Sequence, residues 1–360
     1  MKEAILFSII MPVFNRKKIV DSSIESVLKQ TYSNWELLVI DDCSTDGTVD
    51  KLEKISALDN RVRVFQTPVN SGPSTARNIG LDNIKGDYVC FLDSDDKFST
   101  DALEVLSMQC SSDPDMVIFD YANCKNINDY MQAKRTRLES FIINKNDIDR
   151  SLLPQHLNVV PPDKYYSQPY TWNKAFKANI LRQNKIHFDD KKRMWEDGEF
   201  VIACMANSRQ IIRINNFLIY VDAANPKSND HLSQGYDRNL AENFLKQYKK
   251  LLGKWGNKYD FFSEYAIRRN YNSFFFVLVL TAMKDSQGRR AKIINVLNDM
   301  AAQKVMTMAK PLTFMEKILR RFLLGKHVYA AYVTLCIYAL CKNAYGRFKN
   351  VVCSIYKREE

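Results

Sequence analysis

Three aspartates lie within four positions of the sequence, directly after an apolar run. Asp93, Asp95 and Asp96 follow Tyr88–Leu92, which is typical of a buried strand. Carboxylates this close repel one another unless a hard cation lies between them. Their oxygens suit Mg²⁺ or Mn²⁺, which commonly bind substrate phosphates as well. The alternative is an acidic turn that caps a helix beginning near Ser99. The cluster therefore predicts either a divalent-metal site or a helix cap.

Other polar side chains follow other apolar runs in the same way. Asn15 and Arg16 follow the first run, and Asp41 and Asp42 follow Glu36–Ile40. Ligands of parallel α/β sheets bind beyond the carboxyl ends of the strands, so we expect these residues to share one edge with the acidic cluster. The aspartate pair could also be an N-cap on the helix after Thr45, and we expect capping and binding to coexist.

The elements that must position these side chains alternate in type over the first 121 residues. Short apolar runs with strand character are separated by segments with helical spacing. Strands are expected at Ile5–Val13, Glu36–Ile40, Val62–Val64, Tyr88–Leu92 and Met116–Tyr121, and helices at Ile19–Leu28, Val49–Ile55, Ser74–Ile84 and Asp101–Met108. This pattern predicts an α/β fold whose mostly parallel sheet is flanked by helices on both faces. From Leu240 onward helical periods dominate, which predicts a helical C-terminal extension.

In order and spacing, a series of motifs in the N-terminal part resembles the family-2 glycosyltransferases, which have the GT-A fold. A weaker resemblance continues through Thr171–Lys174 and Trp195–Asp197, and Cys43 stands where the family usually has a small or polar residue. The segments that carry the resemblance are Ser8–Asn15, Ser26–Tyr32, Glu36–Thr48, Asn70–Gly80, Lys85–Tyr88 and the acidic cluster Asp93–Asp96.

The resemblance implies a site for a UDP-sugar donor. Pro12 and Val13 would flank the nucleobase through backbone groups, and Asp42 would accept a hydrogen bond from the uracil ring N–H. Asp96 would bind the metal, Mn²⁺ or Mg²⁺, and Asp93 would lie nearby. Asp95 would lie near the ribose or the metal. The other implied donor-side residues are Asn15, Asn70, Gly72 and Arg77, of which Arg77 could equally form a structural ion pair.

Glu196 and Asp197 form a late acidic pair. Taken alone, they could be solvated acids that balance the basic run Lys191–Arg193. The resemblance implies that one of them is the general base. It would take the proton of the acceptor hydroxyl in a single displacement that inverts the anomeric centre. Motif position favours Asp197 over Glu196. Trp172 and Lys174 would line the acceptor or diphosphate region, although the tryptophan could equally belong to the core.

Charge is unevenly distributed along the chain of 360 residues, whose net charge is +11. Residues 1–120 hold 12 basic and 20 acidic side chains, whereas residues 301–360 hold 11 basic and 3 acidic ones. The basic excess lies among aromatic and leucine residues, away from the motifs. This favours an anionic membrane surface as a partner and argues against nucleic acid. The longest uncharged run there is 14 residues, short of the roughly 20 that a spanning helix needs. A soluble helical subdomain is the alternative.

Cysteine usage bears on location. The eight cysteines include no Cys-x-x-Cys pair and the four histidines do not cluster with them, so a thiolate zinc site is not expected. Scattered thiols, and a first segment without a signal-peptide pattern, suggest a cytoplasmic protein. With the basic tail, we expect it to be peripheral on the inner face of the plasma membrane. The resemblance to GT-A enzymes, some of which have a late histidine as a metal ligand, implies that His231 could be one, although a lone histidine is usually not a ligand.

These features predict a GT-A catalytic domain over residues 1–235, with a donor half (about 1–121) and an acceptor half (about 122–235). A helical region (236–303) and a basic amphipathic helical tail (304–360) would follow. The expected function is a non-processive, metal-dependent hexosyl- or N-acetylhexosaminyltransferase. It would act on a glycan or lipid-linked acceptor in polysaccharide or lipopolysaccharide synthesis. A catalytically silent sugar-nucleotide-binding protein and a nucleotidyltransferase are the alternatives, although the latter usually needs a Gly-rich basic loop that Met11–Asn15 does not provide.

Overall fold

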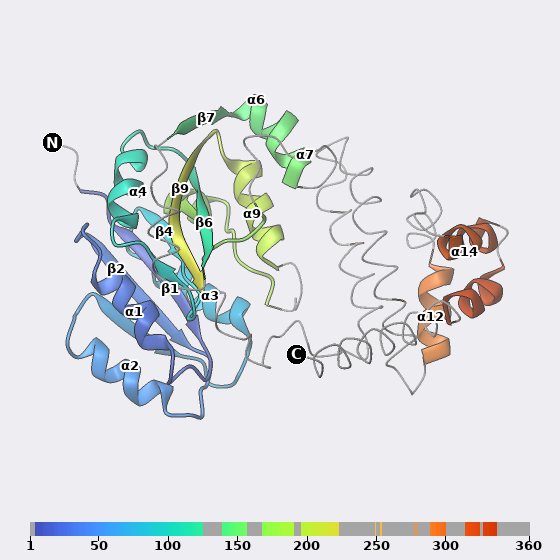
Figure 1. The fold of residues 1–360 in the computed structure, drawn as a ribbon, viewed down its shortest axis with the longest axis horizontal. Coiled ribbons are helices and arrows are strands. Elements are labelled where there is room, and N and C mark those ends of the chain that lie inside the picture. The colour runs from blue at the N-terminus through green and yellow to red at the C-terminus, as the bar shows by residue number, and fades with distance from the viewer. Residues whose placement is uncertain are drawn as a thin grey trace, which may run out of the picture. The chain divides into compact units, whose positions relative to one another are not determined.

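The structure is a computed structural model, drawn as a ribbon in Figure 1. It describes residues 4–124, 139–156, 168–190, 196–222, 289–299, 314–324 and 327–336, with the isolated positions 249, 253 and 278. The chain divides into two compact units. Unit 1 comprises residues 1–156 and 162–233, and unit 2 comprises residues 157–161 and 234–360. All described strands belong to unit 1.

The first half of unit 1 is a parallel α/β layer. The strands are β1 (Phe7–Val13), β2 (Trp35–Asp41), β3 (Val62–Gln66) and β4 (Tyr88–Phe91), and the helices between them are α1 (Val20–Leu28), α2 (Thr48–Ser56) and α3 (Pro73–Asn83). The strands lie in the order β3-β2-β1-β4, and every neighbouring pair is parallel. The carboxyl ends of the strands therefore meet at one edge, as the sequence pattern predicts.

Beyond β4 the sheet is mixed and continues in the order β8-β6-β9-β5, with β7 on β9. β8 is antiparallel to both β4 and β6, whereas β9 is parallel to β6. The expected α/β fold with a large helix-flanked sheet is confirmed, and the antiparallel strands come mainly from beyond the regularly alternating region. The elements are β5 (Lys97–Phe98), α4 (Ala102–Cys110), β6 (Met116–Cys124), β7 (Ser140–Asn144), α6 (Lys145–Asp147), the π-helix η1 (Ile148–Leu152), α7 (Leu153–His156), β8 (Lys174–Lys177), α8 (Ala178–Gln183), α9 (Glu196–Asn207) and β9 (Gln210–Asp222).

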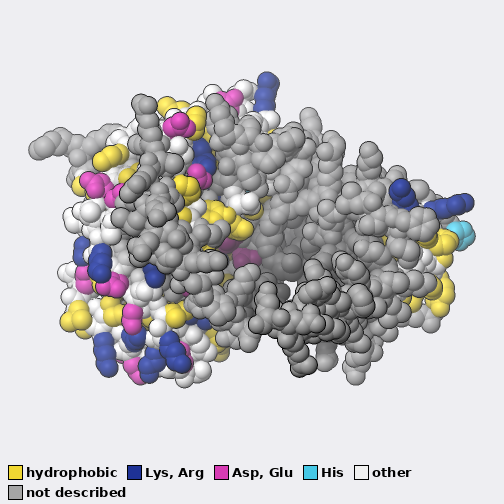
Figure 2. Space-filling view, in the orientation of Figure 1, with side chains coloured by type: hydrophobic (Ala, Val, Ile, Leu, Met, Phe, Trp, Pro, Cys, Tyr) yellow, Lys and Arg dark blue, Asp and Glu magenta, His cyan; other side chains and the backbone are white. Residues whose placement is uncertain are grey.

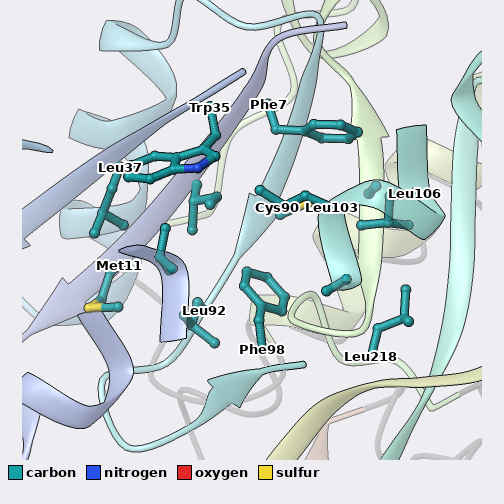
Figure 3. Packing of buried hydrophobic residues seen from close by; sticks show 14 of the residues in the cluster. Phe7, Met11, Trp35, Leu37, Cys90, Leu92, Phe98, Leu103, Leu106 and Leu218 are labelled. Atoms are coloured by element: carbon teal, nitrogen blue, oxygen red, sulfur yellow. The ribbon is translucent and has the colours of Figure 1, made fainter. Parts of the chain in front are cut away.

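Apolar residues cover both faces of the parallel strands. On one face, residues of β1 and β2 share a buried cluster with side chains of α1, α2 and α4; Figure 3 shows Phe7, Trp35 and Leu103 in this cluster. On the other face α3 packs closely on β1. A Cβ at Gly80 would lie 2.5 Å from Cγ2 of Ile10. Burial on both faces explains why β1 and β2 read as nearly continuous apolar runs.

A closed polar network holds the amino ends of these strands together. We call it the amino-end network: Ser8, Glu36, Arg63, Lys85 and Gly86. The Glu36 carboxylate accepts from the Ser8 hydroxyl and the Lys85 N–H, each at 2.6 Å, and from the Arg63 guanidinium at 2.9 Å. The Gly86 N–H donates to the Ser8 hydroxyl, and a Cβ at Gly86 would lie 2.7 Å from backbone atoms of β1 and the segment before it. The Lys-Gly motif therefore has a structural role.

The described part of unit 2 is helical: α12 (Arg289–Asn298), α14 (Phe314–Leu324) and a helix over residues 328–336. α14 buries Leu319 and Leu323 and exposes Lys317 and Arg321, so this helix is amphipathic. No helix in the described part of the chain is long and apolar enough to cross a membrane.

Surface charge on the described part of unit 1 is mixed in sign. On the face shown in Figure 2, acidic and basic side chains are interspersed, with no continuous basic area among the described residues.

Candidate active site

One cavity lies at the carboxyl edge of the parallel strands and has a volume of about 420 Å³. It is built by the segments that follow β1, β2 and β4, together with the start of α3. Its lining residues are Pro12, Val13, Phe14, Arg16, Asp42, Asn70, Gly72, Pro73, Arg77, Asp93, Ser94 and Asp95. The structure thus brings together residues more than 80 positions apart, and most of the donor-side residues predicted from the sequence are among them.

Two of the residues predicted on the donor and metal side do not line the cavity. Asn15 has a positive φ of 52°, and its side-chain oxygen accepts from the Thr45 N–H at 2.8 Å while its own N–H donates to the Ser44 hydroxyl. It therefore ties the segment after β1 to the segment after β2. Asp96 is buried, and its N–H donates to the Asp93 carbonyl at 3.0 Å, which closes a turn.

Asp42 organises the wall of the cavity that leads into α3. Its Oδ1 accepts from the Thr67 hydroxyl at 2.9 Å and the Ser71 N–H at 2.8 Å, and its Oδ2 accepts from the Gly72 N–H at 2.7 Å. Gly72 has φ +88°, a backbone conformation that favours glycine, and α3 begins directly after it. One buried carboxylate therefore fixes the loop before α3.

The helix-cap alternatives are wrong for both acidic groups. α2 begins at Thr48, whose N–H is accepted by Asp46, whereas the carboxylate of Asp41 accepts from the Ser44 N–H within a turn. α4 begins only at Ala102, so the acidic cluster does not adjoin the start of that helix. Asp42, Asp93 and Asp95 instead line the cavity.

Arg77 connects the cavity to the late acidic pair. This α3 side chain is buried, and its Nη2 donates to Asp93 at 3.0 Å while its Nη1 donates to Asp197 at 3.2 Å. Burial alone would lower the pKa of Arg77, but the neighbouring carboxylates of Asp197, Asp93 and Glu196 outweigh it and raise that pKa. The structural ion pair considered for Arg77 is therefore present.

Asp197 lies in the first turn of α9, one residue after Glu196. Burial raises the pKa of Asp197 to about 6, although the Arg77 guanidinium acts to lower it. A carboxylate with such a pKa is ionised at neutral pH and holds a proton more readily than an ordinary aspartate, as a general base should. Asp197 is not among the cavity-lining residues, and the basic run that could have neutralised it, Lys191–Arg193, lies outside the described residues.

The described residues include no group of three or more acidic, histidine or cysteine side chains arranged to hold a metal ion by themselves. Asp93 and Asp95 line the cavity, and Asp96, the next residue in the sequence, is buried. The late histidine considered as an additional ligand, His231, lies outside the described residues, as does Trp195.

Lys174 and Trp172 take positions that the sequence left open. Lys174 is fully buried, and its ammonium donates to the carbonyls of Gln168 and Tyr170 and to the side chain of Asn173, at 2.7–2.8 Å. Burial lowers the pKa of Lys174 well below its usual value. Trp172 stacks on Tyr170, with ring centroids 4.9 Å apart. Lys174 thus fixes the turn before β8 and is not among the cavity-lining residues.

Arg16, which the sequence placed with Asn15 after the first strand but to which no role was assigned, lines the cavity, and so does Phe14, which sequence reasoning did not single out. The Arg16 guanidinium makes two long contacts, at 3.4 Å, to the carbonyls of Phe14 and Asn15, and no ion pair to it is found among the described residues. Its position directly after a strand end was the available signal.

Comparison with known proteins identifies the domain. Residues 8–175 match the family model described as glycosyl transferase family 2. The crystal structure of S. aureus TarS residues 1–349 in complex with UDP-GlcNAc has the same fold, with a TM-score of 0.64, 20% identity, and coverage of 92% of this chain and 91% of that one. Residues 8–175 therefore form a glycosyl transferase family 2 domain, with the GT-A fold.

Two curated relatives illustrate the similarity. The Escherichia coli UDP-Glc:alpha-D-GlcNAc-diphosphoundecaprenol beta-1,3-glucosyltransferase WfgD is 42% identical over 124 residues, 34% of this chain and 47% of WfgD. The Staphylococcus aureus poly(ribitol-phosphate) beta-N-acetylglucosaminyltransferase TarP is 31% identical over 232 residues, 63% of this chain and 65% of TarP. The chain spans less than half the length of the first curated relatives that it matches.

Proposed function

We propose that the protein is an inverting glycosyltransferase that moves a sugar from a UDP-sugar to an acceptor hydroxyl. The observation that carries this proposal is the cavity at the strand ends. It is lined both by Asp42 and by Asp93 and Asp95, and Arg77 links it to Asp197. The proposed nucleotide site and the proposed site for phosphate charge thus line one cavity, and Arg77 links that cavity to the proposed base.

Asp42 is suited to the uracil ring. Each carboxylate oxygen can accept about two hydrogen bonds, and the Gly72 N–H is the one donor to its Oδ2 among the described residues. One acceptor position there is left for the ring N–H of uracil. Since the loop is already held by the same carboxylate, nucleotide binding would not have to order it.

The acidic residues fit a hard cation whose coordination is completed by the donor. Mg²⁺ in nucleotide sites is usually held by one or two carboxylates plus substrate phosphates, and Asp93 and Asp95 both line the cavity. We assign these two residues to a Mg²⁺ or Mn²⁺ ion, with Asp96 as the further ligand that the family resemblance implies. The ion would offset charge on the departing diphosphate.

Asp197 is assigned as the general base, with Glu196 as its neighbour in the acidic pair. The acceptor oxygen attacks the anomeric carbon from the face opposite the diphosphate. The carbon–oxygen bond to UDP breaks, and the hydroxyl proton passes to the Asp197 carboxylate. Its Oδ1 is bound to Arg77, and its Oδ2 has no hydrogen-bond partner among the described residues, which leaves that oxygen for the hydroxyl.

Calorimetry with UDP-Glc, UDP-Gal, UDP-GlcNAc, UDP-GalNAc and UDP-GlcA, with Mn²⁺ and with chelator, tests the donor and metal assignments. One UDP-sugar should bind and be slowly hydrolysed or transferred, and chelator should abolish turnover. Binding without any turnover would instead indicate a silent binding protein. Formation of a nucleotide sugar from UTP and a sugar phosphate would indicate a nucleotidyltransferase. Full activity in excess chelator would contradict the metal assignment.

The acceptor is proposed to be a glycan or lipid-linked glycan of surface-polysaccharide synthesis. The names of the relatives support this, since WfgD is named for a diphosphoundecaprenol-linked sugar and TarP for poly(ribitol-phosphate). For such an acceptor we propose a cytoplasmic enzyme, peripheral on the inner face of the plasma membrane.

Exposed Lys317 and Arg321 on α14 are candidate membrane contacts. Each basic residue near an anionic surface contributes about 1 kcal/mol. The Lys317→Glu/Arg321→Glu variant should therefore float less well than the unmodified protein with anionic vesicles at low salt. If the unmodified protein does not float, the surface is not a membrane contact.

A further inference from the structure

Arg77 forms ion pairs with two acids, Asp93 and Asp197, which have different roles in the proposed reaction. Asp93 belongs to the donor side and Asp197 to the acceptor side, yet both accept from the same guanidinium. The Arg77 side chain is 7% exposed, whereas those of Asp93 and Asp197 are 33% and 21% exposed. The arginine is therefore the buried centre of the group, and the acids are its accessible ends.

Several contacts fix the arginine itself. Its guanidinium carbon lies 5.4 Å from the ring centroid of Phe188, and that ring stacks on Phe200 of α9 at 4.2 Å. The neighbouring residue Asn78 exchanges two hydrogen bonds with the backbone of Phe188, at 2.8 and 2.9 Å. α3, the Phe188 segment and α9 are thus locked together around Arg77.

We propose that Arg77 is a positioning residue: its forked guanidinium holds Asp197 in register with the donor-side acid Asp93. This rests on the proposed function, and it differs from the donor-binding role that the family resemblance implies for Arg77. A role as the main diphosphate contact is disfavoured because the Arg77 side chain is only 7% exposed and its accessible partners, Asp93 and Asp197, already neutralise its charge.

Arg77→Lys tests the geometry while keeping the charge. A lysine cannot hold two carboxylates in a planar fork, so Asp197 should lose its register. We expect kcat to fall about 100-fold, the scale of a displaced reacting group. The affinity for UDP, measured by calorimetry, should stay within about threefold because the positive charge remains. A large loss of UDP affinity at unchanged kcat would overturn the proposal in favour of diphosphate binding.

Arg61→Lys is the matched control. Arg61 also pairs with an aspartate, Asp59 at 2.7 Å, and also lies over an aromatic ring, that of Trp35 at 3.8 Å, but it does not line the cavity. This variant should keep wild-type kcat and UDP affinity. An equal loss of kcat in both variants would mean that any such ion pair acts through general stability, and it would overturn the proposal.

A double-mutant cycle separates positioning from an independent effect. If Arg77 acts through Asp197, then adding Arg77→Lys to Asp197→Asn should lower kcat by less than about twofold further. If the two losses multiply, Arg77 acts on another step and the proposal fails. If Arg77→Lys does not fold, Phe188→Leu can replace it, because it loosens the same guanidinium. Phe188→Leu should lower kcat in the unmodified protein but not in the Asp197→Asn variant. No turnover by the unmodified protein with any UDP-sugar would overturn the proposed function together with this one.

Discussion

The two ends of the parallel strands are both rich in charged motif residues, but they use them differently. At the amino end, Glu36 is 8% exposed and receives three donors from its own network. At the carboxyl end, Asp93 and Asp197 share one arginine and remain partly exposed. At the amino end the carboxylate is fully hydrogen-bonded within the protein, whereas at the carboxyl end the two carboxylates still have acceptor oxygens that a ligand could use. Density of polar motif residues alone therefore does not distinguish the two ends; the carboxyl end differs in having a cavity, which Asp93 lines, and acids that remain partly exposed.

The largest expected effect of breaking the carboxyl end is on chemistry. Asn is nearly isosteric with Asp but accepts a proton poorly, so Asp197→Asn should lower kcat by about 100-fold or more. UDP affinity should stay near wild type. Turnover with a matched acceptor and calorimetry with UDP measure the two quantities. Glu196→Gln is the control and should do less damage. The reverse ranking would place the base on Glu196.

Breaking the amino end should affect stability and leave chemistry alone. Glu36→Ala leaves the Ser8 hydroxyl, the Lys85 N–H and the Arg63 guanidinium without their acceptor, which should lower the free energy of unfolding by about 3 kcal/mol. Turnover per folded molecule should not change. Urea unfolding measures the loss, with the exposed Glu104→Ala as a control expected within about 0.5 kcal/mol. A stable Glu36→Ala variant with low kcat would show that the two ends are not distinct.

A smaller effect is expected on nucleobase preference. Asp42→Asn removes a charged acceptor for the uracil N–H, so the affinity for UDP should fall about tenfold or more. The preference over CDP should also shrink, because the amide can donate to cytosine where the carboxylate cannot. Calorimetry with UDP and CDP measures both. An unchanged UDP-to-CDP ratio would remove Asp42 from the nucleobase site.

The smallest effect is on pH dependence. The base must be ionised to act and the pKa of Asp197 is raised to about 6. The value of kcat/KM should therefore rise about tenfold per pH unit below about pH 6 and level off above about pH 7. Removal of the Arg77 charge should shift this rise in kcat/KM to higher pH, since Arg77 lowers the pKa of Asp197. A profile that is flat across this range would contradict Asp197 as the titrating base.

The sequence predicted the parallel half of the fold well, because apolar periodicity and strand-end polar residues are local signals. It also predicted most of the cavity-lining residues. It could not predict that Arg77 meets Asp197, which is 120 positions away, since no local pattern reports an ion pair between distant elements. The antiparallel pairing of β8 with β4 and β6 was missed for the same reason. The role of Glu36 was hidden because a buried acid with three donors looks like any other acid in the sequence.

The position of β9 has a consequence for dissection of the molecule. The match to the family model ends at residue 175, inside β8. A fragment that ends there would lose β9. Among the described strands, β9 pairs with β5, β6 and β7. β5, β6 and β7 would lose this partner and β4 would lose most of its pairing with β8. The open backbone edges would promote edge-to-edge aggregation. The smallest soluble unit should therefore extend at least through Asp222.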